Sequence, residues 1–188
     1  GIVITLSVLV LIGWQFDIAV LTSMVQPGRV PMNPMTAVEF LVLGVSLWLL
    51  LPEPLLEKRR IIGLLFAIVA VLIASARIAD IPMMGDLGID EFLFSSKISG
   101  SRMSPDTAKT FLLIAFVLLI LDVKIVNYWF PLTGILSISI IALLALTGAI
   151  YSTLVIYRIA GDIPIPLNTA LGFGVMCIGI LSARPMRE

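Results

Sequence analysis

The sequence predicts an all-α integral membrane protein with six transmembrane helices, arranged as three repeated helical hairpins with both termini in the cytoplasm. Two observations lead to this fold class. Of the 188 residues, 60% are hydrophobic and only 13% are charged, which is too little polar surface to enclose a soluble core of this size. In addition, one helix-start pattern recurs three times, each time directly ahead of an apolar segment. We therefore interpret residues 1–188 as a single membrane domain.

The repeated pattern ends in Thr-Ala and carries a phenylalanine four residues after the threonine, at Phe40, Phe111 and Phe173. Each interval between the threonines has room for two crossings of the bilayer. The sequence therefore predicts hairpins over about 1–52, 61–121 and 132–183, with a long outer loop over 82–104. The residues that mark the repeated helix starts are Pro34, Thr36, Pro105, Thr107, Asn168 and Thr169.

Breaks in the apolar pattern set the boundaries of the crossings. A Gln-Pro-Gly turn at 26–28 ends the first segment, and the prolines of 52–54 with the charged run 57–60 separate the second from the third. The aromatic run 127–131 is typical of a membrane interface. In the last segment, the glycines of Gly172-Phe173-Gly174 indicate close helix packing. The six predicted crossings are 2–24, 34–51, 61–81, 105–121, 132–157 and 167–181.

The repeated starts have a structural interpretation and a functional one. Asn33 and Ser104 are suited to cap a helix with their side chains, and Pro34 and Pro105 suit the first helical position, which needs no N–H donor. Asp106 also suits the positive end of the helix dipole. Capping near lipid explains the pattern by itself. Alternatively, the three helix starts converge on a ligand at the outer face.

Three charged residues fall within or near apolar segments, where a charge costs roughly 2.5–3.5 kcal/mol on insertion scales. Asp17 is expected near mid-membrane, either as a buried functional group or hydrogen-bonded to a neighbouring helix. Glu39 and Lys109 lie about one turn into equivalent helices. We therefore predict that they lie at similar depth, and an ion pair between them is one hypothesis.

Arg77 and Arg158 close the third and fifth segments in similar runs, Arg-Ile-Ala-Asp-Ile-Pro and Arg-Ile-Ala-Gly-Asp-Ile-Pro. The simple interpretation is anchoring at the interface by snorkelling side chains. The sharper interpretation joins them to Glu39 and Lys109 in a polar cluster that binds a small anion or an amphiphile head group. Both interpretations stay open at this point.

Composition excludes several functions and indicates the orientation. There is no histidine and only one cysteine, Cys177, so histidine-ligated haem and Ser-His-Asp catalysis are excluded. No enzyme activity, metal or cofactor is expected in this segment, although a bound lipid stays open. The net charge of zero gives no sign of a nucleic-acid partner. Basic residues are slightly more numerous on the side of the termini, which favours cytoplasmic termini in a bacterial inner membrane.

Two stretches resemble a known family. The run Gly85-Asp86-Leu87-Gly88-Ile89-Asp90-Glu91-Phe92-Leu93-Phe94 and the run Arg102-Met103-Ser104-Pro105-Asp106-Thr107-Ala108 are similar to the multi-pass N-terminal membrane sensory regions of bacterial histidine kinases, PAS-containing hybrid kinases and GGDEF diguanylate cyclases. The departures are Asp106 in place of an asparagine, the charged Lys109, and Leu167 in place of a third proline. The resemblance implies an input module without a defined ligand.

Three functions are weighed on these grounds. The first is a membrane-embedded sensory input domain of a bacterial signalling protein of the histidine kinase or diguanylate cyclase type. The second is a stand-alone scaffold or accessory subunit of a larger membrane complex. A small transporter ranks lower, because the repeats are parallel rather than inverted. The expected partners are the lipid bilayer and either further copies of the chain or other membrane subunits.

Overall fold

The computed structural model describes residues 1–23, 31–51, 56–80, 103–121 and 167–183 of the chain. All regular structure in these ranges is α-helical, which confirms the predicted helical class, and no strand occurs there. The helices are α1 (Ile2–Gln15), α2 (Ala19–Ser23), α3 (Pro34–Leu50), α4 (Glu57–Asp80), α5 (Pro105–Ile120) and α8 (Leu167–Ala183).

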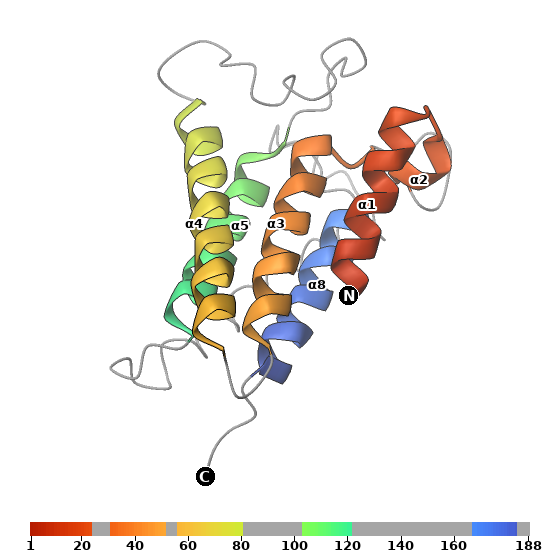
Figure 1. Ribbon diagram of the computed structural model, residues 1–188. Helices are drawn as coiled ribbons and strands as arrows, with labels where there is room; N and C mark the ends of the chain where they lie inside the picture. Colours follow the sequence, from red (N-terminus) through yellow and green to blue (C-terminus); the bar gives the residue numbers. More distant parts are fainter. Residues whose placement is uncertain (24–30, 52–55, 81–102, 122–166, 184–188) are drawn as a thin grey trace.

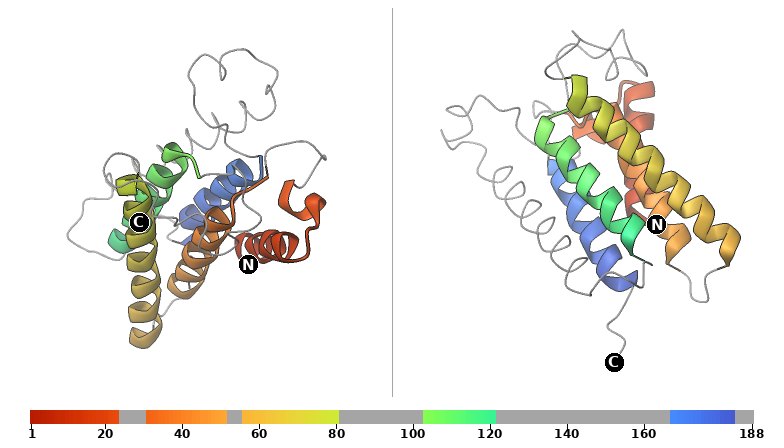
Figure 2. Two further views of the ribbon diagram at one scale, coloured as in Figure 1. Left: turned by 90° about the horizontal axis from the view of Figure 1, so that it is seen from above. Right: turned by 90° about the vertical axis from the view of Figure 1, so that its left-hand side faces the viewer.

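The three helices that follow the repeated starts, α3, α5 and α8, run in the same direction with their N-termini at one end (Figure 1). The helices α1 and α4 run in the opposite direction on the outside of this group (Figures 1 and 2). We call the end that carries the three N-termini the head of the core. The predicted fifth crossing, 132–157, lies outside the described residues, as does the outer loop except for its last two residues.

The centre of the bundle is a layer of three aromatic rings. The repeat aligns Phe40, Phe111 and Phe173, and all three are fully buried. Their ring centroids lie 4.7, 5.0 and 4.9 Å apart, with each pair tilted or edge-on. Such pairs are worth about 0.5–1.5 kcal/mol beyond the area they bury. The three parallel helices are therefore joined at equivalent positions by side chains of one kind.

Buried apolar side chains continue this layering below the phenylalanines. On a helix, residues three or four apart share a face, and counting from each threonine gives equivalent positions on α3, α5 and α8. The layer after the phenylalanines and the one after that are both buried. Their members are Leu43, Ile114 and Met176, then Leu47, Leu118 and Ile180.

Helix α4 packs against α3 through small residues. Gly63, Ala67, Ala70 and Ala74 are buried on its inner face. Ser46 Oγ of α3 donates a hydrogen bond of 2.8 Å to the carbonyl oxygen of Gly63, so the two backbones approach closely. Small residues at a helix contact are typical of membrane proteins, where close backbone approach supplies the packing energy.

The first predicted crossing, 2–24, is wrong as a single helix. Helix α1 ends at Gln15, and the backbone N–H of Ile18 donates to the Gly13 carbonyl oxygen at 2.8 Å. Asp17 has a φ of 57°, so it occupies the left-handed position that ends a helix in a Schellman motif. A Cβ on Gly13 would lie 2.7 Å from Leu21 Cβ, which explains how α2 folds back against α1.

Helix lengths bear on the predicted membrane class. In the described part, one helix is long and apolar enough to cross a membrane, over Glu57–Ala79 of α4. Three other apolar helices are shorter: Ile2–Gln15, Pro34–Leu50 and Asn168–Ser182. The structure thus establishes an all-helical chain with one candidate span among the described residues.

Candidate functional site

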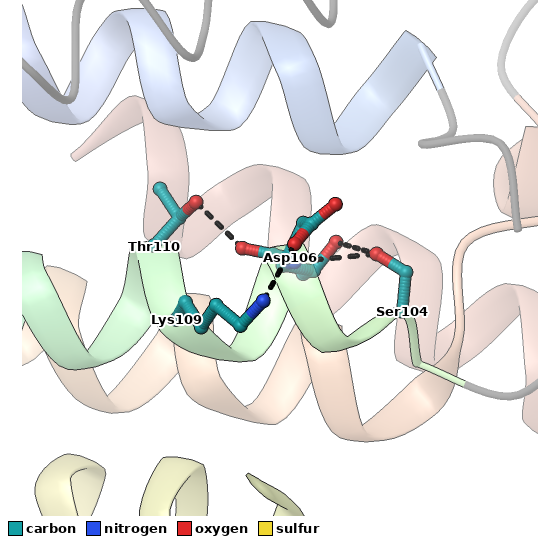
Figure 3. A network of polar contacts seen from close by, with 5 residues as sticks. Ser104, Asp106, Lys109 and Thr110 are labelled. Atoms are coloured by element: carbon teal, nitrogen blue, oxygen red, sulfur yellow. Dashed lines mark hydrogen bonds and ion pairs between the residues drawn. The ribbon is translucent and has the colours of Figure 1, made fainter. Parts of the chain in front are cut away.

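The helix starts at the head of the core are capped as the sequence predicts. Asn33 Oδ1 accepts a hydrogen bond of 2.7 Å from the Met35 backbone N–H. Ser104 Oγ accepts one of 3.2 Å from the Thr107 N–H and also shares a hydrogen bond of 2.7 Å with Thr107 Oγ1 (Figure 3). Prolines occupy the first turn of both helices. The caps satisfy backbone donors that would otherwise be left unpaired inside the bundle.

The repeated threonines form a polar layer above the aromatic one. Thr36, Thr107 and Thr169 are all buried. Each stands four residues before a phenylalanine of the central layer, so it lies on the same face one turn closer to the head. Thr169 Oγ1 has no hydrogen-bond partner. The head of the core is therefore more polar than its middle.

Two methionine carbonyls at the head accept hydrogen bonds from side chains of α1 and α4. Trp14 Nε1 of α1 donates to the Met32 carbonyl oxygen at 2.8 Å. Arg77 Nη2 of α4 donates to the Met103 carbonyl oxygen at 2.9 Å. Met32 and Met103 occupy equivalent places in the repeat, four residues before the threonine. The sequence analysis predicts neither contact, because the acceptors are backbone carbonyls.

Glu39 is fully buried on α3, and neither of its carboxyl oxygens has a hydrogen-bond partner. It lies seven residues before Ser46, which bonds to α4, so Glu39 lies on the same side of α3. The facing surface of α4 at this depth carries Ala70 and Ala74. A carboxyl group is therefore enclosed between helices without a donor, which is costly in a dry interior.

The hypothesis of a Glu39–Lys109 ion pair is wrong. Lys109 has a side-chain exposure of 65% and its Nζ lies 3.0 Å from Asp106 Oδ1 on the same helix (Figure 3). The reason is one residue of phase. Glu39 stands three residues after its threonine and Lys109 two, and this difference turns the side chain by about 100° around the helix.

The other predicted site residues lie in different environments or outside the described part of the chain. Asp17 is exposed beyond the end of α1, so it is not a buried mid-membrane group. Arg77 is buried and hydrogen-bonded inside the bundle, which rules out simple snorkelling. Arg158 lies outside the described residues. Asn168 Nδ2 donates a hydrogen bond of 3.1 Å to the Thr22 carbonyl oxygen and so joins α8 to α2, while Asn168 Oδ1 has no hydrogen-bond partner.

Of the predicted polar cluster, the structure buries two members. Glu39 and Arg77 are both buried, on the neighbouring helices α3 and α4, whereas Lys109 lies on the surface. Among the described residues, no group of three His, Cys, Asp or Glu side chains is placed to hold a metal ion. The candidate site is therefore the head of the core with Glu39 and Arg77 beneath it.

Comparison with known proteins adds no family to this description. No family model, curated protein or solved structure matches the chain. The indications of function are therefore the geometry of the head, the outer surface of the helices and the sequence motifs.

Proposed function

We propose that the chain is embedded in a lipid bilayer, and the surface of α4 is the observation that supports this most strongly. The outward residues Ile61, Leu65, Ile68 and Leu72 are 51%, 54%, 44% and 63% exposed. Between residues 61 and 76, the buried residues of the same helix are all glycine or alanine. A helix of a water-soluble protein has the reverse distribution, with large apolar residues inside. Large residues outside and small ones inside suit a helix surrounded by lipid.

The other helices share this surface. Exposed large apolar side chains also lie on α1, α3, α5 and α8. Helices α3 and α8 have 17 residues each, the lower end of the range of about 17–25 that spans a hydrocarbon core. The exposed large residues on these helices are Ile2, Val8, Leu9, Ile12, Trp48, Phe116, Leu171, Ile178 and Leu181.

Charged residues gather at the ends of α4. The run Glu57-Lys58-Arg59-Arg60 opens the helix, and the Arg59 guanidinium lies 5.4 Å from the ring centroid of Trp48. From 61 to 76 the helix carries no charge. Basic and tryptophan side chains together are typical of a membrane interface, and basic residues favour the cytoplasmic side. We therefore place the start of α4 in the cytoplasm and the head of the core at the outer face.

Within the membrane, we propose that the domain is the sensory input region of a bacterial signalling protein. The second run that carries the resemblance, 102–108, supplies the α5 cap and the carbonyl held by Arg77, and Phe111 just after it supplies one ring of the central layer. A stimulus at the head would therefore act on the packing of all three parallel helices. Helix α8 is coupled to this packing, because Gly172 and Gly179 lie against Phe40 and Leu47 of α3.

The intact mass and the C-terminal peptide of the native polypeptide test the sensory proposal. We expect a mass well above 20.4 kDa, with a kinase or cyclase sequence following Glu188. A mass close to that value would contradict a sensor with its own output domain. It would favour an accessory subunit, whose exposed apolar helices would then bury against a partner protein that purifies with it in fixed ratio.

A further inference from the structure

The buried residues Glu39 and Arg77 belong to the neighbouring helices α3 and α4 and lie at different heights along them. Ser46 and Gly63 are at one level, because they share a hydrogen bond of 2.8 Å. With a rise of 1.5 Å per residue, Glu39 lies about 10 Å above that level on α3, and Arg77 about 21 Å above it on α4. The Arg77 Cα is thus about two helical turns closer to the head than the Glu39 Cα.

The two side chains lean toward each other across this gap. In a helix, the Cα–Cβ bonds tilt toward the helix N-terminus. Because α3 and α4 are antiparallel (Figure 1), Glu39 tilts toward the head and Arg77 tilts away from it. The buried α4 residues between them are Ala70 and Ala74, so no long side chain of α4 stands between Arg77 and Glu39. Arg77 is therefore placed with the carboxyl group of Glu39 below it.

We propose that Arg77 is a two-position switch that holds either the Met103 carbonyl or the Glu39 carboxylate. In the present structure Arg77 Nη2 donates to the Met103 oxygen at 2.9 Å, while both Glu39 oxygens are without a partner. A guanidinium binds a carboxylate in a two-pronged geometry that a single carbonyl does not offer. The unused carboxyl group is thus a second acceptor for the same donor.

The switch is linked to the head because the carbonyl that Arg77 holds belongs to Met103, at the entry to α5. Met103 directly precedes Ser104, the cap of α5, so it is the residue through which the chain enters this core helix. Displacement of that entry releases the guanidinium, which then pairs with Glu39 and ties α4 to α3. This inference rests on the proposed sensory function, because it gives the route by which an event at the head changes contacts deeper in the membrane.

A double-mutant cycle in two backgrounds tests the switch. The full chain is purified in mixed micelles, and unfolding equilibria are measured for Glu39→Gln, Arg77→Gln and the double variant. We expect almost no coupling between them in the parent chain. Adding Ser104→Ala loosens the α5 entry, and the coupling should then reach about tenfold or more in the unfolding equilibrium constant. Thr110→Ala is the matched control, because its hydroxyl bonds only within α5, to the Asp106 carbonyl oxygen.

Every result of this cycle decides the question. Coupling that appears with Ser104→Ala and not with Thr110→Ala supports the switch. Coupling in no background overturns it, as do equal coupling with Thr110→Ala and full coupling in the parent chain, where the pair would be permanent. The coupling measurement needs no output domain, so a negative result would not contradict the sensory proposal. Conversely, a native mass of about 20.4 kDa would contradict the sensory proposal without affecting the measured coupling.

Cysteine labelling gives a second readout that does not depend on unfolding. Met103 is 2% exposed, so Met103→Cys in a Cys177→Ala background should react slowly with a maleimide. Ser104→Ala should raise the rate several-fold. Adding Glu39→Gln should reverse much of that rise, because the carboxylate that competes with the Met103 carbonyl for Arg77 is then absent. A rate that Glu39→Gln leaves unchanged would overturn the switch.

Discussion

Replacement of Gly172 by alanine tests the central packing of the core. A Cβ at this position would lie 2.6 Å from Phe40 Cζ and 2.9 Å from both Cε atoms, well inside van der Waals contact. The Phe40 ring has no space to move into, because it is fully buried against Phe111 and Phe173. The added methyl group must therefore push α8 away from α3 or distort the ring layer.

The expected cost follows from overpacking. Such substitutions cost about 1–3 kcal/mol, offset by the roughly 0.5–1 kcal/mol that alanine gains over glycine in a helix. We expect Gly172→Ala to lower the free energy of unfolding by about 1–2 kcal/mol. Gly174→Ala is the matched control on the same helix, because nothing lies within 4 Å of its Cβ, and it should be neutral or slightly stabilising. Gly179→Ala should fall between them, since it meets only the flexible end of Leu47.

Equilibrium unfolding in mixed micelles, followed by circular dichroism, measures all three variants under one condition. The order of stability should be Gly174→Ala, then Gly179→Ala, then Gly172→Ala. A Gly172→Ala variant as stable as Gly174→Ala would refute the close contact between α8 and the Phe40 ring, and with it the arrangement of the three parallel helices.

Three further predictions concern single side chains. Phe111→Ala should lower the free energy of unfolding by about 3–5 kcal/mol, because it opens a cavity in the ring layer. Phe116 is 48% exposed on the same helix, so Phe116→Ala should change that free energy by under about 1 kcal/mol. Equal losses for the two variants would count against the ring layer. Asp17→Val should lower the free energy of unfolding by about 1–2 kcal/mol, because a branched residue is strained at a φ of 57°, and Asp17→Gly should not lower it. A lower melting temperature for Asp17→Gly than for Asp17→Val would contradict the left-handed end of α1. Glu39→Met should raise the stability by about 1–3 kcal/mol, because it removes a buried group without a hydrogen bond; a loss would show that Glu39 has a stabilising partner.

The helix starts of the core were predictable from local chemistry. A polar capping residue followed by proline and then Thr-Ala predicts a helix start without tertiary information, because the pattern concerns one turn of one helix. The structure bears this out with the Asn33 and Ser104 hydrogen bonds. The common depth of the three phenylalanines was also visible in the repeat, although their mutual contact depends on the parallel arrangement of the helices.

The sequence pattern does not show rotation around a helix or a break within an apolar run. Hydropathy places Asp17 inside a continuous crossing, because it does not reveal that Gly13 and a left-handed Asp17 end α1. Glu39 and Lys109 share a depth but point to different sides. The contacts of Trp14 and Arg77 with methionine carbonyls use backbone acceptors, which a sequence does not mark.

Labelling from the two sides of the membrane tests the central claim most directly. Lys58 and Lys109 are both exposed, at the two ends of the bundle, so a single cysteine at either position, in a Cys177→Ala background, should leave the fold intact. A membrane-impermeant maleimide applied to spheroplasts should label Lys109→Cys, and Lys58→Cys only after permeabilisation. Labelling of both from the same side, or release of the chain from membranes by alkaline carbonate, would contradict an embedded bundle with its head outside.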